Sequence, residues 1–143
     1  MCCVLTVWDK LSVGLKMGNW LKKIMTWFCH LAEPEARFIF IDVGYHSYSL
    51  AAALKERDDC ELVAFIDEEP WNHLTELLAV KLYYPSELVA LCEKHQVHRV
   101  ICFDGIGWSI DEQTQKRLKN LKVSVITLPS TTVSAQALAI VTG

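Results

Sequence analysis

The sequence predicts an α/β fold, in which a parallel sheet of about five strands carries helices on both faces. Short apolar runs of strand length recur between residues 37 and 128, and segments with helical periodicity separate them. Strands that alternate with helices pair in parallel through crossover connections. The chain has 143 residues, 52% of them hydrophobic, which is enough for one globular domain with a full core and an appendage.

The first element is an amphipathic helix over residues 10–32, followed by a linker that ends at residue 34. Three lysines interrupt it, so it is a poor membrane span. Its apolar side suits packing on another helix, on the domain's own sheet or in a dimer, and we expect a homo-oligomer. Peripheral contact with a membrane surface is the alternative, because tryptophans and lysines both suit that boundary. The apolar side holds Val13, Met17, Trp20, Leu21, Ile24, Trp27, Phe28 and Leu31.

Residues 35–143 form the predicted α/β domain. Its strands are apolar runs bounded by polar turns, at residues 38–43, 61–66, 80–84, 99–103 and 123–127. Its helices are expected at residues 47–57, 71–78, 86–96 and 111–121, and Ser86 is the expected N-cap of the third. Leu50, Ala51 and Leu54 should face inward. Residues 130–143 are expected to form either an extra strand or a docked segment.

Charge and cysteine usage narrow the function classes. A net charge of -3 argues against nucleic-acid binding, which needs a basic face to neutralise phosphates. The charge is uneven, because residues 1–32 carry a net +3 and the remainder a net -6. The six cysteines lack disulfide-style spacing and no secretory signal is evident, so a cytoplasmic location is expected, with membrane association as a variant.

Three predicted loops, at residues 42–47, 67–70 and 103–107, should meet at the carboxyl edge of the sheet, where α/β folds bind ligands. Gly44 lies between the first strand and its helix, where a dinucleotide fold needs glycine so that the backbone can approach a pyrophosphate. Asp67 ends the second strand, 23 residues after Gly44. A carboxylate there can bond a ribose hydroxyl and would repel a 2′-phosphate, which favours NAD or a nucleotide diphosphate over NADP.

Four stretches carry a family resemblance: 38–44, 62–70, 80–85 and 97–102. The most specific is Phe65-Ile-Asp-Glu-Glu-Pro70. Together they resemble the Rossmann-like domain, also called CoA-binding-like, of bacterial nucleotide-sugar dehydratases and polysaccharide biosynthesis proteins. The N-terminal domain of sugar acetyltransferases is similar, and His46 matches a histidine in its loop. The resemblance implies a Rossmann-like fold and a nucleotide or nucleotide-sugar ligand.

The loop departs from the family's three-glycine pattern. Asp42 replaces the first glycine and Ser47 the third, so that only Gly44 is kept. A carboxylate at Asp42 would repel a bound pyrophosphate unless it turned away or was paired. Ser47 adds bulk where the helix approaches the strand, although its hydroxyl could cap the helix or contact phosphate. Gly44 can equally serve only to permit the turn.

We therefore expect a stand-alone nucleotide- or nucleotide-sugar-binding module, regulatory or accessory in sugar metabolism, with NAD or a nucleotide sugar as ligand. The alternative is a structural or interaction module that keeps the fold without the ligand, tethered through its N-terminal helix. The predicted ligand-binding residues are Gly44, Tyr45, His46, Ser47, Asp67, Asp104 and Gly105.

A complete enzyme is the least favoured function. The chain has no nucleophile elbow, no Walker loop and no acid–base pair that can be named. In the families that it resembles, the catalytic part follows this domain. A zinc site is not predicted either, because Cys92, His95 and His98 lack a fourth ligand.

Overall fold

The computed structural model describes residues 34–143, which form one of the two compact units into which the chain divides. The helix predicted over residues 10–32 lies outside the described residues. Within them, a six-stranded sheet has the order β3-β4-β2-β1-β5-β6. The strands are β1 (Ala36–Ile41), β2 (Cys60–Ile66), β3 (Glu76–Leu77), β4 (Val80–Tyr83), β5 (Arg99–Phe103) and β6 (Ser124–Leu128).

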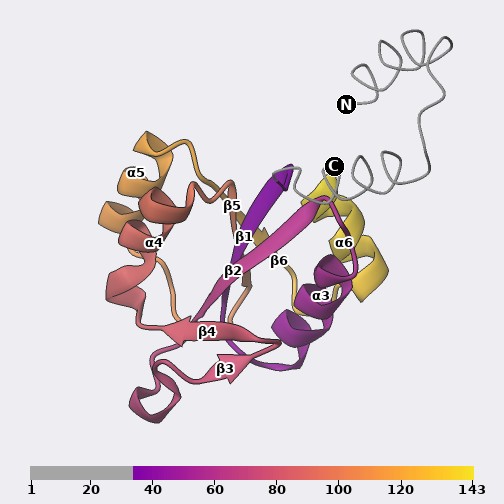
Figure 1. The fold of residues 1–143 in the computed structure, drawn as a ribbon, viewed down its shortest axis with the longest axis horizontal. Helices are drawn as coiled ribbons and strands as arrows, with labels where there is room; N and C mark the ends of the chain where they lie inside the picture. The colour runs from indigo at the N-terminus through magenta and orange to yellow at the C-terminus, as the bar shows by residue number, and fades with distance from the viewer. Residues whose placement is uncertain (1–33) are drawn as a thin grey trace, which may run out of the picture. The chain divides into compact units, whose positions relative to one another are not determined.

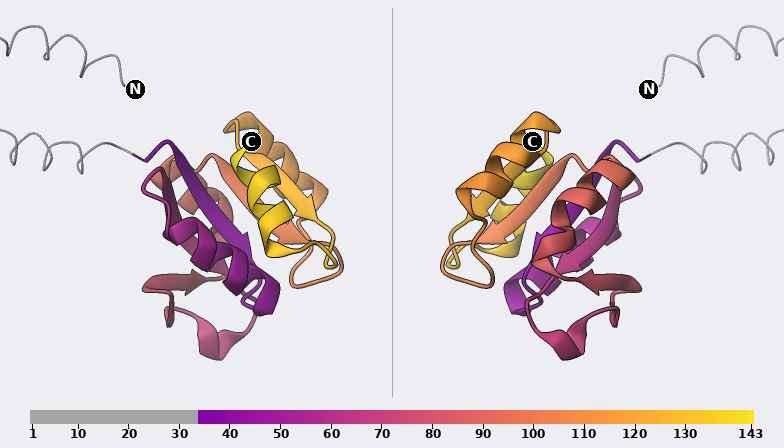
Figure 2. Two further views of the ribbon diagram at one scale, coloured as in Figure 1. Left: turned by 90° about the vertical axis from the view of Figure 1, so that its right-hand side faces the viewer. Right: turned by 90° about the vertical axis from the view of Figure 1, so that its left-hand side faces the viewer.

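Five of these strands pair in parallel, as the sequence predicts, and only β3 is antiparallel, to β4. The helices are α3 (Tyr45–Lys55), α4 (Leu88–His95), α5 (Glu112–Asn120) and α6 (Ser134–Thr142). Helices α4 and α5 cover one face of the sheet, and α3 and α6 cover the other (Figures 1 and 2). The predicted α/β architecture with helices on both faces is confirmed.

Two apolar layers hold the helices to the sheet, and successive residues of β1 supply both because side chains alternate along a strand. Phe38 and Phe40 are buried on the α3/α6 face, while Ile39 and Ile41 are buried on the α4/α5 face. Residues 50, 51 and 54 of α3 are buried as predicted. The central strand is therefore covered on both sides, which is why its sequence is continuously apolar.

The short helix predicted over residues 71–78 is wrong. Only Pro70–Asn72 make a 3-10 turn, and the chain then forms the β3–β4 hairpin. Leu78 and Ala79 connect the two strands with positive φ angles of 53° and 60°. Two successive positive φ angles are the geometry of a tight hairpin turn, for which glycine and asparagine are the usual residues. Neither residue type occurs at this turn, so the sequence offered no signal for it.

The start of α4 also differs from the prediction, because Ser86 does not cap it. A 3-10 turn over Pro85–Glu87 precedes the helix, and Glu87 is the N-cap residue of α4 without a side-chain capping bond. The Glu87 carboxylate instead accepts a hydrogen bond from the Tyr84 backbone N–H, at 2.9 Å. Proline at residue 85 presets φ for this turn, which moves the start of the α-helix past Ser86.

The end of the chain is a docked helix and not a further strand. Helix α6 follows β6 and lies beside α3 (Figure 2), with Ala137 and Val141 buried in the layer that α3 shares with the sheet. Of the two alternatives that the sequence left open for residues 130–143, the docked segment is the one observed. Among residues 34–143, no helix has both the length and the apolar character needed to cross a bilayer.

Helix α5 has an aspartate cap that yields a pH-dependent prediction. The Asp111 carboxylate accepts hydrogen bonds from the Thr114 backbone N–H (3.0 Å) and hydroxyl (2.6 Å), and these bonds lower the pKa of Asp111. A lowered pKa adds stability above the unfolded-state value of roughly 3.9, and this stability is lost as the pH falls through the folded-state pKa. Thermal unfolding of the wild type and Asp111→Asn between pH 7 and pH 3 should show a melting-temperature difference that changes only below about pH 5. A constant difference across that range would contradict the capping contribution.

Candidate functional site

The turn between β1 and α3 is built around the Asp42 side chain. Asp42 has a φ of 83°, a left-handed conformation that aspartate tolerates better than most residues. Its Oδ2 accepts a hydrogen bond from the Gly44 backbone N–H at 2.8 Å. Gly44 is the N-cap residue of α3, and its φ of -68° is open to any residue. A Cβ added at Gly44 would lie 2.7 Å from Asp42 Oδ2, so the carboxylate would have to turn aside and give up its bond to the Gly44 N–H.

A second glycine contacts Asp42 from the loop after β5. A Cβ added at Gly107 would lie only 2.7 Å from the Cβ of Asp42, and Gly107 has a φ of 72°. The 104–107 loop therefore lies directly against the β1–α3 turn. The Asp42 side chain fills the space between the two glycines, at the carboxyl ends of the neighbouring strands β1 and β5.

The first three residues of α3 have different surroundings. Tyr45 is 79% exposed, and the His46 ring packs on Phe103 of β5 with 5.5 Å between ring centroids. Ser47 is fully buried, and its hydroxyl donates to the Ile41 carbonyl at 3.3 Å. The Ser47 hydroxyl thus ties the helix to the end of β1 and is turned away from the surface of the site.

Asp67 follows β2 and is held in a defined orientation. Its Oδ2 accepts from the Asn72 side-chain amide at 2.6 Å, and its backbone N–H donates to the Tyr83 carbonyl at 3.0 Å. The same loop is tied down further along by His73, which stacks on Tyr84 at 4.1 Å and contacts Glu87 at 2.9 Å. Asp67 is half-buried, and the bond from Asn72 fixes the orientation of its carboxylate.

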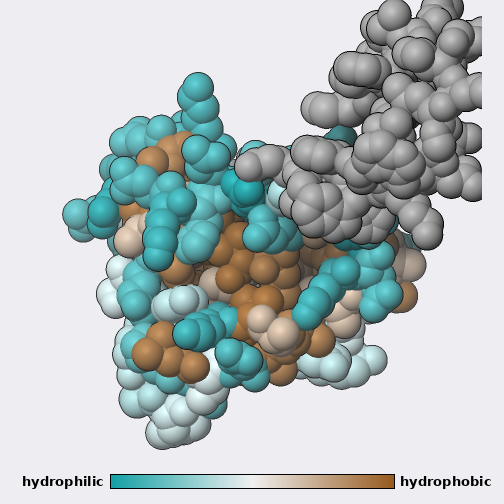
Figure 3. All heavy atoms as spheres, viewed as in Figure 1, coloured by the Kyte–Doolittle hydropathy of each residue, from teal (hydrophilic) through white to brown (hydrophobic). Residues whose placement is uncertain are grey.

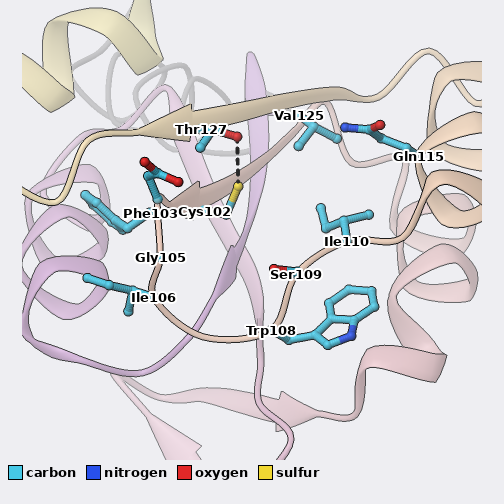
Figure 4. A pocket seen from close by; sticks show the side chains of 11 residues that line it. Cys102, Phe103, Gly105, Ile106, Trp108, Ser109, Ile110, Gln115, Val125 and Thr127 are labelled. Atoms are coloured by element: carbon cyan, nitrogen blue, oxygen red, sulfur yellow. Dashed lines mark hydrogen bonds between the residues drawn. The ribbon is translucent and has the colours of Figure 1, made fainter.

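A pocket of about 160 Å³ lies at the carboxyl ends of β5 and β6. The loop after β5 borders it through Asp104, Gly105 and Trp108, and α5 contributes Gln115 (Figure 4). Cys102 and Thr127 point toward each other from neighbouring strands, with 3.3 Å between sulfur and hydroxyl oxygen. The polar groups of this pocket are uncharged apart from Asp104.

The structure therefore divides the predicted site residues into three places. Gly44, Tyr45, His46 and Ser47 form the start of α3, Asp67 lies in the loop after β2, and Asp104 and Gly105 border the pocket. Sequence reasoning missed Asn72 and Gln115 as site residues, and it missed the contact of Gly107 with Asp42. The glycine pair at 105 and 107 in the loop after β5 was the one signal that could have indicated a close approach there.

Among residues 34–143, the cysteines and histidines do not form a further reactive centre. Burial raises the pKa of the Cys92 thiol to about 12, so it stays protonated at neutral pH. The Nδ1 atom of His98 accepts a hydrogen bond from the Arg37 backbone N–H at 3.1 Å. No group of three or more histidine, cysteine, aspartate or glutamate side chains within residues 34–143 is placed to hold a metal ion.

The fold of this chain is similar to that of several solved structures. One of them is the UDP-D-quinovosamine 4-dehydrogenase from Vibrio fischeri. It is 23% identical, with a TM-score of 0.56, over 68% of this chain and 80% of that protein. RSP, a Rex-family repressor, is 14% identical, with a TM-score of 0.55, over 96% of this chain and 73% of RSP. A structure of RSP with β-NADH matches over 87% of this chain and 66% of RSP, with a TM-score of 0.52 at 14% identity.

The fold is Rossmann-like. At these identities the likeness shows the fold alone. No protein-family model matches the chain, and no curated protein matches it. The sheet order of this Rossmann-like domain places the expected ligand crevice between β1 and β5, where the connections leave to opposite faces.

A dinucleotide does not fit this crevice in the usual way. A Rossmann-like fold holds the pyrophosphate against the backbone N–H groups at the start of its first helix. Here the Gly44 N–H is bonded to the Asp42 carboxylate, and the Asp42 side chain lies between Gly44 and Gly107. The residues at this point therefore do not fit a pyrophosphate beside the Gly44 N–H.

Proposed function

We propose that residues 34–143 form a nucleotide-binding module, which takes its ligand at the carboxyl edge of the sheet. The observation that carries the proposal is Asp67, which directly follows β2, the strand next to β1, and is oriented by Asn72. A fixed carboxylate at this position can accept hydrogen bonds from both hydroxyls of a ribose. A ligand with an unmodified ribose is favoured, because a 2′-phosphate would meet the Asp67 charge.

The fold neighbours support this class of ligand. The repressor RSP is solved with β-NADH, and in another structure with β-NAD+ and operator DNA. The Vibrio fischeri enzyme acts on a UDP-sugar, by its name. A regulatory or accessory role in sugar metabolism is the finer form of our proposal. We do not extend DNA binding to this chain, because its net charge is -3.

A thermal-shift panel tests the proposal. It should contain adenosine, uridine, ADP, UDP, NAD, NADP, CoA and UDP-sugars, each added to the full chain. A ligand at 100 times its dissociation constant stabilises the folded state by roughly 2.7 kcal/mol, which moves the melting temperature measurably. A flat response to every nucleoside and nucleotide would remove the binding function.

Asp67→Ala should weaken binding of the best ligand of that panel by about tenfold or more, because hydrogen bonds to a charged group are the stronger kind. Isothermal titration calorimetry of the wild type and the variant measures the ratio of dissociation constants. Glu68→Ala is the matched control, since Glu68 is an exposed carboxylate one residue further along the same loop. Equal losses in both variants would mean that general charge, and not ribose recognition, causes the effect.

An interaction module is the second candidate function. Two observations favour it. The Asp42 side chain fills the space between Gly44 and Gly107. Apolar side chains also gather on the surface over β2, in the middle of the face seen in Figure 3. Among the described residues, β4 pairs only with the last two residues of β2, so the rest of that strand edge has no neighbouring strand. Open edges accept additional strands. Sedimentation equilibrium of the full chain tests this candidate. An interaction module should self-associate as its concentration rises or should bind a partner.

A further inference from the structure

We infer that Asp42 sets the class of ligand that this module accepts, by placing a carboxylate of the protein itself where a ligand phosphate would bind. The inference rests on the proposed function and makes it narrower. It predicts a nucleoside, or a nucleotide whose phosphates stay away from Gly44, and it excludes ligands that need a diphosphate at the start of α3.

The first step of the argument is the hydrogen bond itself. A helix N-terminus offers backbone N–H groups to an anion, and the Gly44 N–H stands at the edge of that group. Asp42 Oδ2 already accepts from it at 2.8 Å, a distance typical of a charge-assisted bond. A phosphate oxygen that competed for the same donor would have to displace a carboxylate that is covalently held nearby.

The second step is space. Contacts at Gly44 and Gly107 enclose the Asp42 side chain from two sides, because a Cβ at either position would approach it to 2.7 Å. The Gly107 contact is made with the Cβ of Asp42, which no change of rotamer can move away. Rotation of the carboxyl group alone therefore leaves the base of the side chain in the crevice.

The third step is charge. A phosphate at Gly44 would lie next to the Asp42 carboxylate, and like charges at close range repel each other most where solvent is excluded. Asp104 adds a second carboxylate at the same edge of the sheet, in the loop that contacts Asp42. Within the described residues no lysine or arginine is found paired with Asp42 to offset its charge.

The test is the ratio of dissociation constants for adenosine and ADP, and for uridine and UDP, measured by calorimetry on the full chain. In the wild type the diphosphate should bind no more tightly than the nucleoside. In Asp42→Gly, which frees the Gly44 N–H and suits the positive φ, the diphosphate should bind more tightly by about tenfold or more. Asp58→Gly is the matched control, because it removes an equal charge from an exposed position between α3 and β2, away from the carboxyl edge, and should leave the ratio near the wild-type value.

The outcomes separate this inference from the proposed function. Diphosphate binding that is tenfold tighter than nucleoside binding in the wild type would overturn the inference and leave the function intact. An equal gain in Asp58→Gly would also overturn it. If Asp42→Gly binds a diphosphate and the wild type binds no ligand at all, the result supports the inference and contradicts the proposed function. If Asp42→Gly does not fold, the NMR amide resonance of Gly44 in the wild type provides the test. Inorganic pyrophosphate should leave its chemical shift unchanged, and a changed chemical shift overturns the inference.

Discussion

Phe65→Ala should lower the free energy of unfolding by about 3–5 kcal/mol, the range found for large aromatic side chains removed from a packed core. Phe65 lies in β2 with no exposed surface, and its ring is 5.9 Å from the ring of Phe40 on the neighbouring strand β1. Both rings belong to the layer beneath α3 and α6. The alanine variant would leave a cavity. Strand β2 cannot move to close it, because at Phe65 it is paired with β1 on one side and β4 on the other.

Urea denaturation, followed by circular dichroism, measures this loss. Tyr45→Ala is the control, because it removes an aromatic side chain of similar size that is 79% exposed, and a change of within about 0.5 kcal/mol is expected. A loss below about 1 kcal/mol for Phe65→Ala would contradict the packing described for this layer.

Gly107→Ala should destabilise the domain more than Gly105→Ala, although both residues have nearly the same backbone conformation. Their φ angles are 72° and 70°. An L-residue in this left-handed region costs roughly 1–2 kcal/mol, and both variants incur that cost. Only the Gly107 variant adds a steric overlap, with Asp42, because nothing lies within 4 Å of a Cβ at Gly105. Overpacking adds about 1–3 kcal/mol, so the total at Gly107 should be about 2–5 kcal/mol.

A double-mutant cycle isolates the contact between the two loops. In the Asp42→Gly background the overlap disappears, so Gly107→Ala should then cost about the same as Gly105→Ala. Chemical denaturation of the wild type, the two single variants and the double variant gives the coupling energy. A coupling energy near zero would mean that the 104–107 loop does not press on Asp42, and it would weaken the inference about the ligand class as well.

The group that fills the crevice is a small side chain, not one of the aromatic residues nearby. Tyr45, His46 and Trp108 are the large side chains near the predicted loops, but Tyr45 is exposed, His46 packs on Phe103, and Trp108 borders the pocket on the α5 side. Asp42 occupies the space instead. It does so because a positive φ turns its carboxylate back onto the Gly44 N–H.

The element order could be read from the sequence because it depends on local patterns. The apolar runs of β1, β2 and β5 predict strands that are buried on both faces. Helix α5 is polar, and its buried residue Leu118 marks the side that faces the sheet. The β3–β4 hairpin could not be read in this way. Its turn uses Leu78 and Ala79 at positive φ, which local propensity disfavours and only the surrounding contacts stabilise.

The candidate site shows the same division. From the sequence alone, Gly44 and Asp67 could be assigned to the carboxyl edge of the sheet, because each follows an apolar run of strand length. The sequence also showed that Asp42 and Ser47 depart from the three-glycine pattern. What these two residues do was decided by tertiary structure: Ser47 bonds the end of β1, and Asp42 lies against Gly107, 65 positions away. Periodicity reports which face of an element is buried, whereas the contact between two loops depends on the twist and register of the strands that carry them.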